Sequence, residues 1–158
     1  MIDLDLTDRR LLDLLQHDAS QSNQALASAA HVSPATAMRR VRRLIDAGVI
    51  ERQMALLAPT AVAATSVSVI AEVTLDRQGA EHLLAFENRA VAHAAVQQCY
   101  RVSPGPDFVL VLWLADMASY HALVQQLFTQ DANVRNVKAF FSVHRAKFDP
   151  RISLATPG

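Results

Sequence analysis

Four of five consecutive residues in the first half of the chain are arginines, a density of fixed positive charge that suggests an anionic partner. Arg39, Arg40 and Arg43 follow Thr36 by three, four and seven positions, so a helix would place all four on one sector, with Arg42 more to the side. Guanidinium groups suit phosphate oxygens and guanine edges. The spacing favours a nucleic-acid-binding helix, while a solvated basic helix face remains the alternative.

Start and stop signals of a helix flank these arginines. Ser33 is a suitable N-cap, Pro34 fits the first helical position, and Gly48 is suited to the left-handed position after the last turn. We therefore expect a recognition helix over residues 34–47, with Ser33 and Thr36 near the base edges. Its buried face is expected at four apolar positions: Met38, Val41, Leu44 and Ile45.

Two further helices are expected before this one, and an extended segment after it. Thr7 is a candidate cap for a helix with Asp8 in its first turn and an apolar face of Leu11, Leu12, Leu14 and Leu15. Ser20 to Asn23 supply caps for a second helix rich in alanine. The residues after Gly48 are expected to begin a short wing. The three helices and the wing give a winged helix-turn-helix over residues 1–60.

The net charge of the chain is zero, which weakens any argument from overall charge. Residues 1–59 hold seven basic and seven acidic residues, and the remainder holds eight of each. Most acidic residues of the first part precede position 20, so we expect them to lie apart from the arginines. DNA binding is therefore predicted from the local cluster alone.

Hydrophobic patterning in residues 61–158 predicts a second domain. The expected order is strand, helix, strand, strand, helix, strand, over residues 66–75, 79–93, 96–102, 108–114, 117–130 and 134–147. This βαββαβ order is that of a ferredoxin-like fold, so the whole chain is predicted to be α+β.

One face of that predicted sheet has no helix to cover it. Residues 108–114 are uniformly apolar, so both faces of this strand are expected to be covered. In the last strand Phe140 and Ser142 would point to the bare face, and Phe141 to the other. Such a face is expected to bind a ligand or a second copy of the chain.

The chain resembles the Lrp/AsnC, or feast/famine, family of transcription regulators over nearly its full length. The ordered pieces that carry the resemblance are LDLTDRRLL at 4–12, Ser33-Pro34, Arg40-Val41, Arg43-Leu44, Gly48-Val49-Ile50, Asp116-Met117 and Tyr120. The resemblance implies a regulator that binds double-stranded DNA, responds to a small effector, usually an amino acid, and forms a homodimer or an octamer.

The resemblance also implies effector residues by position: Asp107, Met117, Phe140, Phe141 and Ser142. Asp107 could instead be a loop-capping acid, and the two phenylalanines could be packing residues. The sequence departs from the family pattern where Pro104-Gly105-Pro106 stiffens the loop before Asp107, and where the usual glycine before the last strand is absent.

Other chemistry has little support in the sequence. The six histidines show no metal-ligand spacing, Cys99 is a lone cysteine, and no nucleophile elbow or glycine-rich phosphate loop occurs, so no metal, cofactor or catalytic residue is expected. The apolar runs are too short for a membrane span, and a cytoplasmic location is expected. Two alternatives stay open: an enzyme like the sirohaem decarboxylases, which have a similar fold, and a sensor or adaptor without DNA binding.

Overall fold

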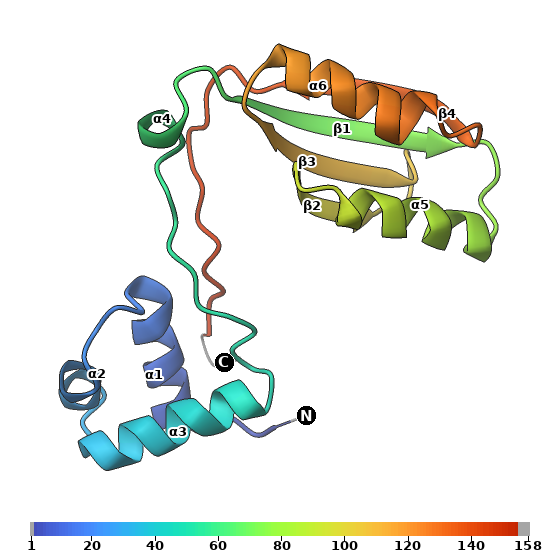
Figure 1. Cartoon of the computed structure of the whole chain (residues 1–158). Helices are drawn as coiled ribbons and strands as arrows, with labels where there is room; N and C mark the ends of the chain where they lie inside the picture. The colour runs from blue at the N-terminus through green and yellow to red at the C-terminus, as the bar shows by residue number, and fades with distance from the viewer. Residues whose placement is uncertain (1, 155–158) are drawn as a thin grey trace. The chain divides into compact units, whose positions relative to one another are not determined.

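The chain forms two compact units, here described from a computed structural model for residues 2–154 (Figure 1). One unit combines Met1–Leu56 with Lys147–Gly158, and the other is Leu57–Ala146. A division near residue 60 would place the residues from Lys147 onward with the second unit. They instead group with the first, because their hydrogen bonds go to its first helix.

The first unit contains α1 (Leu6–His17), α2 (Asn23–Ala29) and α3 (Pro34–Asp46). Helix α1 starts one residue before Thr7, so Thr7 is not its cap. Asp5 is the N-cap: its Oδ1 accepts from the Asp8 amide at 2.8 Å, and Asp8 Oδ2 accepts from the Asp5 amide at 3.2 Å. This reciprocal pair satisfies two amide groups that a helix start leaves unpaired.

The predicted start of α3 is confirmed, and the helix ends at Asp46, one residue before the predicted end, with Ala47 as its C-cap. Ser33 Oγ accepts from the Thr36 amide at 3.2 Å, and Pro34 occupies the first turn. At the other end Gly48 has φ +70°, its amide donates to Ile45 O, and the Val49 amide donates to Leu44 O. These two bonds form a Schellman motif, which ends the helix.

Gly48→Ala should lower the free energy of unfolding of the first unit by about 1 kcal/mol, because an L-residue is strained at this φ. A Cβ here would meet no heavy atom within 4 Å, so the cost is conformational only. Urea unfolding followed by circular dichroism measures it. Gly48→Asn should lose less, because asparagine tolerates this conformation; equal losses would contradict the explanation.

The core of the first unit is small and built partly on alanine. Its buried cluster comprises Leu11, Leu26, Ala27, Ala30 and Ala37. Helix α3 contributes Ala37 to this core and packs Val41 against it. Leu44, at position i+7 on the same side of α3, is also fully buried. The expectation that Met38 and Ile45 are buried is wrong: they flank that stripe and are 57% and 42% exposed.

The wing expected after Gly48 is present only as an irregular segment. Residues 51–58 carry neither helix nor strand, and a single turn, α4 (Pro59–Val62), follows them. This segment leads into the second unit.

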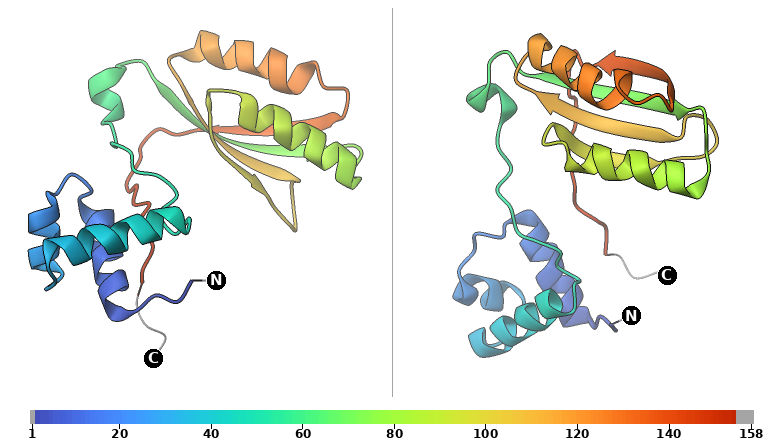
Figure 2. Two further views of the ribbon diagram at one scale, coloured as in Figure 1. Left: turned by 60° about the horizontal axis from the view of Figure 1, so that its bottom comes forward. Right: turned by 45° about the vertical axis from the view of Figure 1, so that its right-hand side comes forward.

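The second unit confirms the predicted ferredoxin-like order. Its elements are β1 (Val67–Leu75), α5 (Ala80–Ala92), β2 (Val96–Arg101), β3 (Phe108–Leu114), α6 (Met117–Leu123), the π-helical turn η1 (Val124–Thr129) and β4 (Val134–Phe141). The sheet order is β2-β3-β1-β4, with every neighbouring pair antiparallel. Both α5 and α6 lie on one face of this sheet (Figure 2).

Only the helix-covered face of the sheet is buried. Alternate residues of β1 and β3 lie there, from Val69 to Leu75 and from Phe108 to Leu114, packed against Phe86 of α5 and Leu123 of α6. The intervening residues of β3 are only half-buried, so the expectation of two covered faces is wrong within this chain. The other face presents Ile70, Tyr100 and Phe140, each about half exposed.

Strand β4 is shorter than predicted. It ends at Phe141, and the Ser142 amide makes a last bond to Ser68 O at 2.9 Å. Strand β1 starts at Val67, so little partner strand remains beyond this point, and Val143 is fully exposed. In residues 2–154 no helix is long and apolar enough to cross a membrane.

Candidate nucleic-acid interface and effector site

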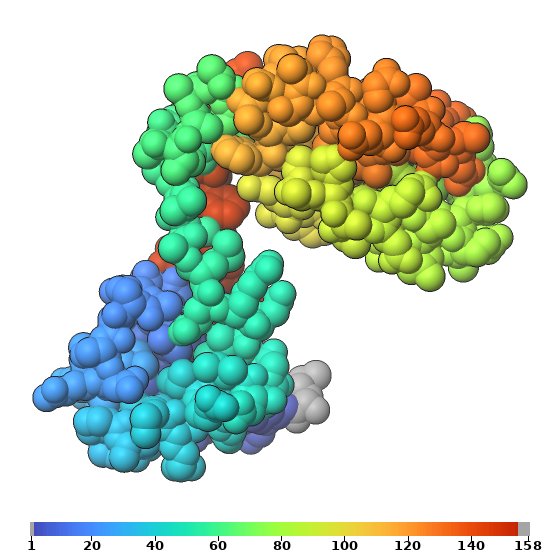
Figure 3. Space-filling view, viewed as in Figure 1, coloured from blue at the N-terminus to red at the C-terminus, as the bar shows by residue number. Residues whose placement is uncertain are grey.

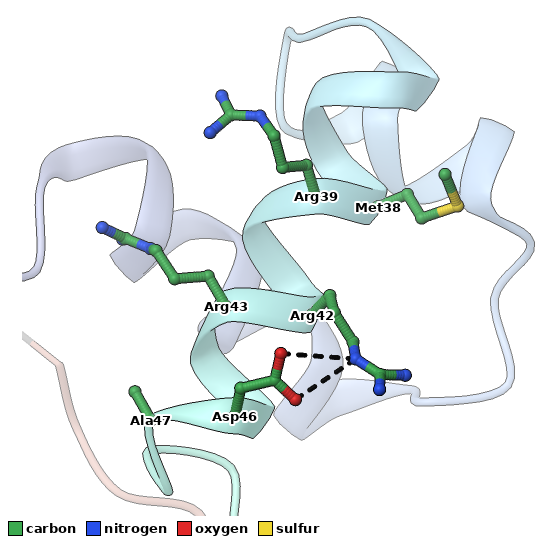
Figure 4. A pocket seen from close by; sticks show the side chains of 6 residues that line it. All are labelled: Met38, Arg39, Arg42, Arg43, Asp46 and Ala47. Atoms are coloured by element: carbon green, nitrogen blue, oxygen red, sulfur yellow. Dashed lines mark hydrogen bonds and ion pairs between the residues drawn. The ribbon is translucent and has the colours of Figure 1, made fainter.

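The arginine-rich side of α3 borders an open hollow on the surface (Figure 4). The residues that line it are Met38, Arg39, Arg42, Arg43, Asp46 and Ala47. All of them belong to α3 or its C-cap, so one helix supplies the whole lining.

Two of the four arginines turn toward α1. Arg40 Nη1 lies 2.6 Å from Asp5 Oδ2 and 3.0 Å from Asp8 Oδ1, and Arg43 Nη2 donates to Asp8 Oδ2. Asp8 is only 1% exposed and is the one fully buried charged side chain in the described part of the chain. The expectation that acids and arginines lie apart is therefore wrong, because the cap of α1 is placed against α3.

These contacts shift the pKa values of Asp5 and Arg40 in the directions that favour their charged forms. The Asp8 backbone amide, and then the Arg40 guanidinium, lower the pKa of Asp5. The Asp5 and Asp8 carboxylates raise the pKa of Arg40. Arg40 Nε is buried and has no hydrogen-bond partner among residues 2–154. The bonds that the described carboxylates of Asp5 and Asp8 accept from Arg40 come from Nη1.

The other two arginines stay on the outer surface. Arg42 Nε lies 3.2 Å from Asp46 Oδ1 one turn later, and both side chains are well exposed. Arg39 is exposed and makes no hydrogen bond or ion pair with any residue that the structure describes. The four arginines, adjacent in the sequence, thus lie in two different environments: Arg40 and Arg43 bind acids near α1, while Arg39 and Arg42 stay on the outer surface.

Ser33 and Thr36 lie together at the start of α3. Besides the cap bond, Ser33 Oγ donates to Thr36 Oγ1 at 2.9 Å. Ser33 is exposed and Thr36 half-buried. All five candidate DNA-binding residues therefore belong to one helix and its cap, with Arg40 and Arg43 held partly by α1.

The candidate effector residues do not converge within one chain. Asp107 precedes β3, beside the end of β1: its Oδ2 accepts from the Leu75 amide at 2.7 Å, and its own amide donates to Val73 O. Phe140 pairs with Ile70 and Phe141 with Val69, near the start of β1. About five residues of strand, or some 17 Å, separate these two ends of the sheet.

The two phenylalanines also point to opposite faces. Phe140 lies on the bare face, in a cross-strand row with Ile70 and Val111. Phe141 lies on the helix side, where its ring meets Tyr120 edge-on at 4.9 Å. Burial raises the pKa of Tyr120.

Met117 and Ser142 lie near this second end of the sheet. Met117 is 42% exposed and precedes Tyr120 by one helical turn. The α6 N-cap, Asp116, accepts from the Ser119 amide at 2.7 Å, and this bond lowers the pKa of Asp116. Ser142 directly follows β4 and bonds to Ser68.

Asp107→Ala should lower the free energy of unfolding of the second unit by about 1–2 kcal/mol, because the Leu75 amide loses its charged acceptor. Denaturant unfolding of the full chain measures it. Asp107→Asn, which keeps a side-chain oxygen, should lose less. If Asp107→Ala left stability unchanged and altered only amino-acid binding, the loop-capping role would be contradicted.

Reasoning from sequence missed three residues that hold the first unit together. Asp5 and Asp8 bind the arginines of α3, and Gln16 binds the backbone of Ile152. The early run of acids was the available signal for the first two. Nothing in the sequence pattern points to Gln16.

Comparisons with known proteins agree with this architecture. Residues 68–152 match the model of the Lrp/AsnC ligand binding domain, and residues 4–51 match that of a winged helix-turn-helix DNA-binding domain. An uncharacterized HTH-type transcriptional regulator of Haemophilus influenzae is 36% identical over 96% of this chain and 89% of its own length.

Solved structures show the same likeness. A crystal structure of an AsnC family transcriptional regulator from Agrobacterium tumefaciens has TM-score 0.87 and 28% identity, covering 96% of this chain and 97% of that one. A feast or famine regulatory protein from M. tuberculosis, complexed with L-methionine, has TM-score 0.80 and 27% identity, covering 95% and 99%.

Proposed function

The chain belongs to the Lrp/AsnC family of transcriptional regulators, and we propose that it binds specific DNA sequences with α3 while an amino acid modulates this binding or the assembly of the protein. The observation that carries the DNA-binding part is Arg39, exposed and without a partner among the described residues, on a helix opened by Ser33. A recognition helix needs side-chain hydrogen-bond donors that are free to bind base edges or phosphates.

The arginines have different roles in this proposal. Arg39 contacts a base edge or a phosphate, together with the polar start of α3 at Ser33 and Thr36. Arg43 is 43% exposed, and a guanidinium has five N–H donors, so it has donors left for a phosphate while it binds Asp8. Arg40, 22% exposed, acts mainly by holding α3 against α1.

Arg43→Ala should weaken DNA binding and reduce the slope of log Kd against log salt concentration by about one, as expected for one lost phosphate contact. Fluorescence anisotropy titrations at several salt concentrations measure both quantities. Arg10→Ala, which removes an exposed arginine of α1, is the control for general charge. An unchanged slope and affinity would remove Arg43 from the interface.

The bare sheet face supports a homodimer. Its central row of Val111, Ile70 and Phe140 is apolar. Tyr100 of β2, which pairs with Val109 of β3, adds a half-exposed aromatic side chain. A second copy would cover this face and present two recognition helices together. Further association into an octamer is compatible with this arrangement.

The effector part of the proposal concerns the end of the sheet near Met117, Phe140 and Ser142. A relative of the same fold carries L-methionine, which makes an amino acid the first ligand to test. Since Asp107 lies at the opposite end of the sheet, it can join these residues only through another subunit. The effector must bind the DNA-competent and incompetent states unequally to have any effect.

A mobility-shift assay with DNA from upstream of the protein's own gene tests the proposal. We expect a shifted band at physiological salt, and a change in apparent Kd when L-methionine or another single amino acid is added. Unrelated DNA of equal length is the control. Absence of any specific band would contradict DNA binding, and a visible absorption band from a bound tetrapyrrole would favour the enzyme alternative.

A further inference from the structure

Residues 147–154 are attached to α1 through their backbone. The Gln16 side chain makes two bonds to one residue: its Nε2 donates to Ile152 O at 3.0 Å, and its Oε1 accepts from the Ile152 amide at 2.6 Å. Seven residues earlier on α1, Arg9 donates to Leu154 O at 3.3 Å. Positions 9 and 16 share one side of the helix, so α1 presents a continuous binding edge.

The side chain of Ile152 takes little part in this contact. It is 71% exposed, while both its backbone polar groups are bound by Gln16. Just before it, Arg151 donates to Asp149 from its amide, Nε and Nη2, which lowers the pKa of Asp149. The segment therefore contains hydrogen bonds of its own between Arg151 and Asp149, and it binds α1 through its backbone.

The chain passes between the two units twice. The first passage is at Leu56–Leu57 and the second at Ala146–Lys147. In the second unit these passages lead to β1 and from β4, whose ends are neighbours because the Ser142 amide bonds to Ser68 O. Both connections thus leave the sheet at the same end of adjacent strands.

We infer that residues 147–154, bound by Gln16 and Arg9, form a second tether that restrains the DNA-binding unit and links β4 mechanically to α1. The candidate effector residues Phe140, Phe141 and Ser142 lie only a few residues before this tether. A ligand that displaces them acts on α1 through residues 142–146 as well as through the linker after α3. This transmission of an effector signal rests on the proposed function, whereas the tether itself does not.

The experiment releases the tether without touching α3 or the sheet. Gln16→Ala removes both bonds to Ile152, and Ile152→Pro removes the amide that Gln16 binds. Ile152→Ala keeps that amide and trims only an exposed side chain. Gln24→Ala, an exposed glutamine of α2, is the control for Gln16→Ala.

Hydrogen–deuterium exchange of the full-length variants, followed by mass spectrometry, reads the tether without DNA or effector. Gln16→Ala should speed exchange at least tenfold at the Ile152 amide within the peptide spanning residues 147–154, because that amide loses its acceptor. Both Gln16→Ala and Ile152→Pro should speed exchange detectably in the peptide that covers α1. Ile152→Ala and Gln24→Ala should match the original protein. Unchanged exchange of Gln16→Ala in residues 147–154 would overturn the docking, and faster exchange there with unchanged exchange in α1 would overturn the restraint.

DNA binding supplies the second measurement. A looser DNA-binding unit loses more freedom on binding, so Gln16→Ala and Ile152→Pro should raise Kd about three- to tenfold, with the two controls unchanged. Their response to L-methionine should also shrink relative to that of the original protein. Failure of the original protein to bind DNA would contradict the proposed function, while the exchange measurements would still decide on the tether.

Discussion

Arg39→Ala should raise the Kd for specific DNA at least tenfold and leave the thermal midpoint of the protein unchanged. Arg39 has no ion pair or hydrogen bond to lose among the described residues, so its removal costs the fold little. A bidentate arginine contact with guanine or phosphate is among the strongest in protein–DNA interfaces, so its loss should be large. A loss of DNA affinity without a loss of thermal stability is expected only for a side chain that makes no hydrogen bond or ion pair within the protein.

Titrations with specific and unrelated DNA, combined with thermal unfolding, measure this result. If Arg39 contacts a phosphate, both DNAs lose affinity and the salt slope falls by about one. If it contacts a base, specific binding falls more than nonspecific binding. Arg42→Ala is the matched control, because Arg42 is also exposed but already paired with Asp46.

Arg40→Ala should behave in the opposite manner. It removes a partner from buried Asp8 and separates α1 from α3, so stability and DNA affinity should fall together. If Arg39→Ala lowered stability, or if Arg40→Ala lowered affinity with stability intact, the division of roles among the arginines would be contradicted.

The elements of this fold were accessible from sequence because local signals define them. Ser33, Pro34 and Gly48 act within a few residues of the helix they bound, and the two-residue alternation of β1 reports directly on one buried face. The order of strands and helices then limits the topology to very few choices. These features require no knowledge of distant contacts.

The environments of the candidate site residues were harder to predict because long-range contacts determine them. Arg40 and Arg43 meet Asp8 from 32 and 35 residues away, and no periodicity reports such a distance. Asp107 lies 32 residues from the Leu75 amide that it binds. Gln16 binds the backbone of Ile152, which leaves no pattern of side-chain types to find.

The bare sheet face illustrates an intermediate case. The alternation of β4 correctly placed Phe140 and Phe141 on opposite faces, but composition alone suggested that β3 is covered on both. An apolar strand without intrachain cover is what an interface needs, since the partner supplies the missing layer. The apolar pattern of β3 therefore reflects two different surfaces: one face is buried in the core, and the other is a half-exposed apolar surface suited to association.

Asp8→Ala is expected to be the most damaging single change in the first unit. Asp8 is 1% exposed, completes the capping pair with Asp5, and binds both Arg40 and Arg43. Its removal takes away one of the two carboxylates that bind Arg40, takes the carboxylate partner of Arg43, and weakens the cap at the start of α1. We expect the free energy of unfolding to fall by about 2 kcal/mol, which is less than for fully buried pairs because both arginines are partly exposed.

The unfolding transition of the first unit, measured by urea titration of the full chain, tests this expectation. Asp13→Ala on the same helix is the matched control, since Asp13 is 62% exposed and its ion pair is with the exposed His17. DNA affinity should fall with Asp8→Ala although a negative charge is removed, because α3 is no longer held in place. Tighter DNA binding with unchanged stability would instead mean that Asp8 merely neutralises the arginines and does not position the helix.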